Sequence, residues 1–216
     1  MKITGSIKIA MILLFVLAAA AGAQSLEKRH QLEIRFGMWN QTTDARSEVD
    51  GSVTVTAENN GLTGGIAYGH WLKEYLGLYI GVSFLSADVR QTVSVLQVSS
   101  ETDYVIPVLF GLKYYFLPSS YPSSIKPYVK AAVGPYFGNQ SETSVSLVVI
   151  SESRSETAFG GQLGAGVDFI LGRHFMTGIS GAYNLQADFA QPIGGSANYS
   201  GPEFTINLSY LFGEGL

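Results

Sequence analysis

Apolar and polar residues alternate with a period of two over most of this chain. The run at 203–212 shows the pattern most clearly, because one parity is large and apolar: Phe204, Ile206, Leu208, Tyr210 and Phe212. The positions between them are polar up to Ser209. A period of two is that of a β-strand with one apolar and one polar face.

The same alternation predicts eight strands, at residues 31–40, 62–70, 76–84, 104–116, 126–138, 159–169, 175–185 and 203–212. The connections between them alternate in length, and the first and last are long. Short turns alternating with long loops are typical of membrane barrels, with the turns in the periplasm and the loops outside the cell. We therefore expect an all-β fold, an eight-stranded antiparallel up-and-down transmembrane β-barrel with short periplasmic turns and long extracellular loops.

One parity of these strands carries polar and charged residues. They are Glu33, Arg35, Lys113, Lys130, Gln162, Asp168, Asn184, Glu203 and Asn207. On a lipid-facing surface each Lys or Arg near the midplane would cost about 2–4 kcal/mol. We therefore expect this parity to face the lumen, where three bases and three acids can pair. A barrel of eight strands is filled by its own side chains, so we expect a structural polar network rather than an ion pathway.

Aromatic residues gather near both ends of the predicted strands. We expect an inner level of Trp71, Tyr114, Phe116, Phe169, Phe175, Tyr210 and Phe212. The expected outer level comprises Phe84, Tyr104, Phe137, Phe159 and Phe204. Strand propensity alone would also enrich aromatics, but their clustering at both ends favours girdles at the two membrane interfaces.

The N-terminal residues have the features of an export signal. Lys2 and Lys8 precede an apolar run at 9–20, and the small residues at 21–23 form a cleavage site. The run is shorter than the ~20 residues of a spanning helix. We expect residues 1–23 to be a cleaved signal peptide and 24–216 to be the barrel domain; the alternative is an uncleaved anchor.

Composition narrows the function further. The chain has no cysteine, which excludes disulfides and thiolate chemistry, and only 14% of its residues are charged. A soluble barrel would need a more highly charged outer face. Without the signal peptide, 11 basic residues stand against 17 acidic ones, a net charge of −6, which argues against nucleic acid as a partner.

Taken together, the strand-end aromatics, the alternation and the loop lengths make the chain resemble the small eight-stranded outer-membrane barrels. The OmpA transmembrane domain and OmpX represent this family, and the resemblance covers nearly all of residues 24–216. It implies a monomer in the outer membrane, with membrane lipid and the barrel assembly machinery as partners. One departure is that Gly213 and three further residues follow Phe212, whereas such barrels usually end on an aromatic residue.

Catalysis is not expected. The chain contains His30, His70 and His174, but none is placed near a serine and a carboxylate in a way that suggests a hydrolytic triad. His70 and His174 could share the periplasmic rim, although two histidines without a third ligand make a poor zinc site. We expect no catalytic residue, metal or cofactor. A lipid-modifying enzyme of the lipid A acylase type and, less favoured, a soluble ligand-binding barrel remain as alternatives.

The long loops carry 11 acids and three arginines, a net charge of −8, which a solvated surface explains because the acids lack the spacing of a calcium loop. Three loops nevertheless contain β-branched runs, at 53–56, 93–98 and 145–150. These runs predict that strands continue beyond the bilayer as a protruding sheet. We expect Leu147, Val148, Val149 and Ile150 to contact an extracellular protein or surface polymer, in a structural or adhesive role.

Overall fold

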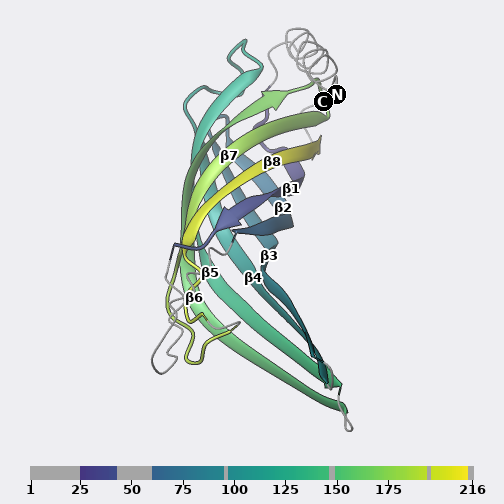
Figure 1. The fold of residues 1–216 in the computed structure, drawn as a ribbon. Coiled ribbons are helices and arrows are strands. Elements are labelled where there is room, and N and C mark those ends of the chain that lie inside the picture. Colours follow the sequence, from purple (N-terminus) through teal and green to yellow (C-terminus); the bar gives the residue numbers. More distant parts are fainter. Residues whose placement is uncertain (1–24, 43–59, 95–96, 146–148, 194–195, 214–216) are drawn as a thin grey trace, which may run out of the picture.

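The computed structural model describes residues 25–42, 60–94, 97–145, 149–193 and 196–213. These residues form eight strands, β1 (His30–Asn40), β2 (Asn60–Lys73), β3 (Leu76–Ser94), β4 (Gln97–Tyr115), β5 (Ile125–Val145), β6 (Val149–Ile170), β7 (Phe175–Gln186) and β8 (Gly201–Phe212). Each strand pairs with the next, and β8 pairs antiparallel with β1, so the sheet closes into a barrel (Figure 1). The predicted fold class is confirmed.

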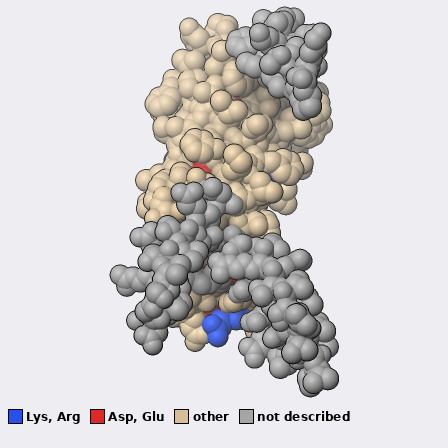
Figure 2. Space-filling model, viewed as in Figure 1, with Lys and Arg blue, Asp and Glu red and all other residues tan. Residues whose placement is uncertain are grey.

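The outer wall of the barrel is apolar, as expected for a surface in contact with lipid. Side chains that are more than half exposed include Phe36, Leu62, Phe110, Phe204 and Ile206. Figure 2 shows almost no charged atoms over the described part of this wall. In water such a surface would be unfavourable, because it exposes many large apolar side chains. In a bilayer the same side chains contact lipid tails.

The inner face combines long side chains with glycines that make room for them. At several inward glycines an added Cβ would come within 3.0 Å of a lumen side chain. The pairs include Gly81 with Arg35, Gly111 with Tyr79, Gly160 with Tyr136, Gly166 with Tyr128 and Gly178 with Asp168. Each of these glycines thus leaves the space that a long side chain from another position occupies, and the lumen of this narrow barrel is filled in this way.

Four strands extend well past the closed barrel. β3 last pairs with β2 at Leu85, and β6 last pairs with β7 at Gly160. Beyond these points β3 and β4 pair as far as Ser94 and Gln97, and β5 and β6 pair as far as Val145 and Val149. The result is a four-stranded arm, β3–β4–β5–β6, which projects at the end opposite the two termini (Figure 1).

The described residues of two of the three β-branched runs, at 93–94, 97–98, 145 and 149–150, continue the barrel strands as predicted. Residues 95–96 and 146–148 of these runs, the whole run at 53–56 and the predicted signal peptide lie outside the described residues. About ten residues of β6 lie beyond its last contact with β7, which at about 3.3 Å per residue makes the arm about 33 Å long.

One expected girdle residue lies elsewhere. Trp71 was placed at the inner aromatic level, but it is 1% exposed and stacks on Tyr115 inside the barrel, with ring centroids 4.4 Å apart. The reason is parity: Trp71 follows Gly69 and Ala67 on the inward face of β2. Tyr114 and Phe116, on the outward parity of the segment ending β4, are exposed as expected.

Gly166→Ala should destabilise the barrel by about 1–3 kcal/mol, the usual cost of overpacking. The new Cβ would lie 2.6 Å from both the Tyr128 hydroxyl and the backbone oxygen of Ile179. Gly77→Ala is the matched control, because the nearest atom to its Cβ is 3.9 Å away. Urea unfolding in lipid vesicles, followed by tryptophan fluorescence, measures both, and equal stabilities would contradict this account of lumen packing.

Candidate functional site

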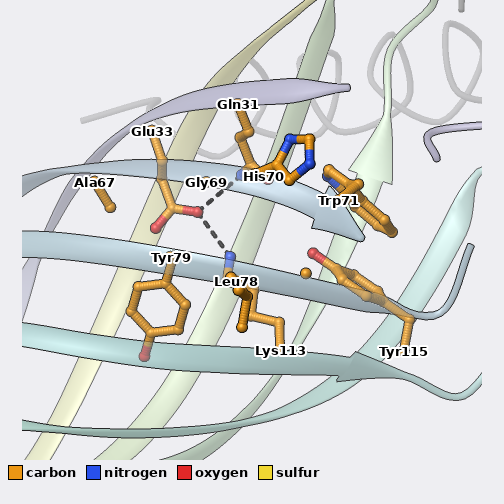
Figure 3. A pocket seen from close by; sticks show the side chains of 11 residues that line it. Gln31, Glu33, Ala67, Gly69, His70, Trp71, Leu78, Tyr79, Lys113 and Tyr115 are labelled. Carbon is orange, nitrogen blue, oxygen red and sulfur yellow. Dashed lines mark hydrogen bonds and ion pairs between the residues drawn. The ribbon is translucent and has the colours of Figure 1, made fainter. Parts of the chain in front are cut away.

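A polar cluster fills the half of the lumen that lies nearer the start of β1 and the end of β8. Lys113 on β4 lies 2.7 Å from Glu33 on β1 and 3.8 Å from Asp168 on β6. Glu33 also accepts a hydrogen bond from Gln31, at 3.1 Å, as Figure 3 shows. Because the three charged residues come from non-adjacent strands and are all buried, the cluster crosslinks the barrel from within.

Asp168 has two further partners. Tyr115 donates a hydrogen bond to one of its carboxylate oxygens at 2.9 Å, and the Asn207 amide donates to the other at 3.4 Å. Lys113 Nζ also lies 4.8 Å from the centre of the Tyr128 ring. Each charge in the cluster is therefore compensated in a region with little access to water.

A second cluster lies nearer the opposite mouth of the barrel and is centred on Glu203. The amide groups of Gln162 and Asn184 both donate to Glu203 Oε2, at 2.9 Å. Asn184 in turn accepts a hydrogen bond from the Tyr136 hydroxyl at 3.2 Å. Strands β5, β6, β7 and β8 are tied together by these bonds.

Two bases occupy the region between the clusters. Arg35 lies 3.7 Å from Glu33, and its guanidinium group occupies the space left by Gly81. Lys130 is 6% exposed, and no carboxylate oxygen of the described residues lies within 4.0 Å of its ammonium group. All nine polar residues that the sequence pattern placed in the lumen are buried there: seven belong to the two clusters, and Arg35 and Lys130 lie between them.

An apolar plug closes the periplasmic end of the lumen. It consists of Leu26, Trp71, Tyr115, Tyr128, Ile170, Met176 and Leu211. Leu26 belongs to a segment before β1 that sequence reasoning left unassigned, and its N–H donates to the Ser119 hydroxyl at 2.9 Å. The chain just before the first strand therefore folds across the periplasmic mouth.

A second apolar plug closes the other mouth and uses the loop between β7 and β8. Phe189, Ile193 and Tyr199 from this loop pack with inward residues of the barrel, including Trp39 and Leu85. Residues 186–201 were predicted only to be a loop between two strands. The sequence clue to this plug was the presence of three large apolar residues in an otherwise polar stretch. In the structure the inward Gly138 makes room for the plug, because an added Cβ would lie 2.8 Å from the Phe189 ring.

The two plugs and two polar clusters leave little free space. The void beside Glu33, Lys113 and Tyr79 has a volume of about 10 Å³, roughly the least that holds one water molecule. Side-chain packing therefore fills this part of the described lumen.

The histidines gather at the periplasmic rim, although not as the sequence suggested. His30 and His70 face each other across β1 and β2, with ring centroids 4.7 Å apart, whereas His174 stacks on Tyr210. His30 Nδ1 hydrogen-bonds the Tyr68 hydroxyl at 2.6 Å. Within the described ranges no group of three potential metal ligands is found, and none of the three histidines hydrogen-bonds a serine or a carboxylate. The described residues also contain no helix long and apolar enough to cross a membrane.

The arm offers surfaces of a different kind. In the part of the chain that the structure describes, no strand pairs with the outer edge of β3 over residues 88–94 or of β6 over residues 149–158. The hairpin of β5 and β6 closes at the pair Val145–Val149, so Val149 and Ile150 begin β6 at the far end of the arm. Of the four residues expected to make an extracellular contact, these two are described.

A closed antiparallel barrel with an apolar wall, a filled lumen and a long extension at one end defines a small outer-membrane barrel protein. The family model for the outer membrane protein beta-barrel domain matches residues 11–212. The chain belongs to this family, and its place is the outer membrane.

Solved structures agree on the fold. Neisserial surface protein A is 12% identical over 85% of this chain and 97% of that one, with a TM-score of 0.50. The Ail protein of Yersinia pestis, in complex with the heparin analogue sucrose octasulfate, is 16% identical over 86% of this chain and 99% of that one, also with a TM-score of 0.50. OprG of Pseudomonas aeruginosa is 15% identical over 88% and 98% of the two chains, with a TM-score of 0.48. No curated protein sequence matches the chain.

Lys113→Met should destabilise the barrel by about 3–5 kcal/mol, because it leaves Glu33 and Asp168 buried without their shared cation. Adding Glu33→Gln should recover part of this loss, since the double variant buries one acid fewer. Lys73→Met is the control: its side chain is 61% exposed in a 3.6 Å ion pair with Glu27, so about 0–1 kcal/mol is expected. Urea unfolding in vesicles measures all three; a double variant less stable than Lys113→Met would contradict the coupling.

Planar-bilayer recordings of the purified protein should show no stable current of porin size. The physical reason is that both mouths are closed by apolar plugs and the charges between them are paired or buried. Steady open-channel steps comparable to those of a 16-stranded porin would show that the plugs do not hold in the membrane.

Proposed function

We propose that this protein is a non-enzymatic outer-membrane barrel that acts through its extracellular arm, in surface interaction or adhesion. The observation that carries the proposal is the four-stranded arm, whose two outer edges have no strand partner among the described residues and which projects from the end opposite the start of β1. A barrel that only filled the membrane would not need four strands that continue about 33 Å past the closed part of the barrel.

The chemistry of an unpaired strand edge supports this role. Its free N–H and C=O groups can pair with an extended segment of another protein, which adds a strand to the sheet. The far end of the arm adds apolar character, because Val93, Val98, Val145 and Val149 stand in register across its four strands. A protein segment with its own β-branched residues fits both features.

The comparisons support adhesion in a general way. Ail is named for attachment and invasion, and its solved complex holds a sulfated heparin analogue. The arm of the present chain is rich in acids, and a polyanion of that kind would be repelled by it. We therefore propose a protein segment or an uncharged surface polymer as the partner rather than a sulfated polysaccharide.

A lipid-modifying enzyme is the alternative function, and no observation favours it. Such an enzyme needs a nucleophile or a general base oriented by a neighbouring group. Among the described residues the histidines lie at the periplasmic rim, where His30 pairs with Tyr68.

Replacing residues 145–150 with a Gly/Ser linker should abolish most of the surface binding without unfolding the barrel. Val145, Val149 and Ile150, the described residues of this segment, lie at the far end of the arm, outside the closed barrel. Bacteria displaying each version are compared for autoaggregation and for attachment to cultured cells and immobilised matrix protein, while heat-modifiable migration on gels reports folding.

The matched control replaces residues 190–192, which are exposed on a different loop, with Gly/Ser. This control should bind as the parent does. If the 145–150 variant folds and adheres as well as the parent, the far end of the arm is structural and the proposed function is wrong.

A further inference from the structure

The two faces of the arm differ in charge. Register places Asn139, Ser141, Ser153 and Ser155 on the face that continues the lipid-facing wall, with Tyr104 beside them on β4. The serines are exposed, and Ser155 donates a hydrogen bond to the Asn139 amide oxygen at 2.7 Å. None of these outer-face residues is charged.

The opposite face of the arm, which continues the lumen wall, holds the charges. Asp103, Gln140 and Arg154 form one row across β4, β5 and β6, and Glu156 lies on the same face of β6. The charged residues whose side chains are described in this part of the arm thus share one face.

The change in residue type along the outer face marks the membrane boundary. On β6 the outward residues are Leu163, Gly161 and Phe159, followed by Thr157, Ser155 and Ser153. On β5 the same change comes between Phe137 and Asn139. Because exposed aromatics mark the interface, the hydroxyl-bearing positions begin where the hydrocarbon layer ends.

From Phe159 to Ser153 the strand rises about 20 Å along its own axis, which a tilt of about 35–45° reduces to about 14–16 Å along the membrane normal. The head-group layer is only about 5–7 Å thick, so these positions lie beside the head groups and the sugars attached to them.

We infer that the outer face of the arm, from Tyr104 and Asn139 to Ser153, binds the uncharged sugar portion of glycolipids in the surrounding outer leaflet. Serine hydroxyls and the asparagine amide both donate and accept hydrogen bonds, as sugar hydroxyls do. The face is continuous with the wall that contacts lipid. The absence of acids from this face also avoids repulsion from lipid phosphates. The inference concerns a different surface from the far end and edges of the arm, and holds whether or not those mediate adhesion.

Spin labels can test which face meets the sugars. The chain has no native cysteine, so Ser153→Cys on the outer face and Arg154→Cys on the inner face can each carry a single nitroxide. The barrel is placed in phospholipid vesicles alone, with lipid A, or with glycolipid that carries a core oligosaccharide. We expect the label at 153, but not at 154, to lose mobility and accessibility to a water-soluble relaxation agent when core sugar is present.

Two outcomes would overturn the assignment. Equal changes at both labels, or none at either, would show that the arm does not present its outer face to the sugars. A full effect with lipid A alone would show that head-group phosphate or acyl chains, rather than core sugars, are recognised.

Paired charge variants give an independent measurement. Ser153→Glu with Ser155→Glu, and Arg154→Glu alone, each lower the net charge by about two units at neutral pH. The outer-face pair should reduce the core-bearing glycolipid retained per barrel about tenfold, as expected for the loss of two neutral hydrogen bonds, and Arg154→Glu should retain the parental amount. Equal retention in the two variants would contradict a sugar-binding face. Replacing residues 145–150 should leave retention unchanged, which separates this inference from the proposed adhesion.

Discussion

Every backbone N–H and C=O group in the hydrocarbon layer must find its partner within the protein, because lipid offers none. Eight strands satisfy this only by closing β8 onto β1, and closure at this strand number leaves a lumen just wide enough for side chains. The alternation of residue types, the filling of the lumen and the neutrality of its charges all follow from that closure. Because the lumen is narrow, Tyr128 fits only beside Gly166, and Arg35 only beside Gly81.

The order of layers in the lumen follows from the energetics of buried charge. An ion pair away from water is costly unless each charge has close partners. Here the Glu33–Lys113–Asp168 cluster and the Glu203 cluster lie between two apolar plugs, one made partly by Leu26 and the other by Phe189, Ile193 and Tyr199. The plugs exclude water, which strengthens the polar contacts between them. The polar clusters in turn connect strands that share no backbone hydrogen bonds.

Strand periodicity predicted the fold and the face of each lumen residue, because the contrast between lipid and lumen is imposed at every second position. Parity also explains the position of Trp71. Its place in the alternation of β2 directs the side chain into the lumen, and this outweighs the general preference of tryptophan for membrane interfaces. Periodicity could not predict that Lys113 meets Glu33, since β1 and β4 are not neighbours and the contact depends on how the barrel is sheared. The loop plug at 186–201 was missed for a related reason: its contacts are long-range and follow no period.

Beyond the bilayer the demand for closure ends, and the structure changes accordingly. Water can satisfy the outer edges of β3 and β6, so an open four-stranded sheet becomes stable where an open edge in lipid would not be. The alternation nevertheless persists, because the pleat of each strand continues without interruption from wall to arm. The face that contacts lipid tails along the barrel therefore contacts the head-group layer along the arm. The face that lines the lumen points away from the surrounding lipid along the arm. The serines and the acids of the arm are therefore separated by the same two-residue alternation that separates lipid-facing from lumen-facing residues in the barrel. Along the arm the outer face meets polar head groups instead of hydrocarbon, so hydroxyl groups take the place of apolar side chains.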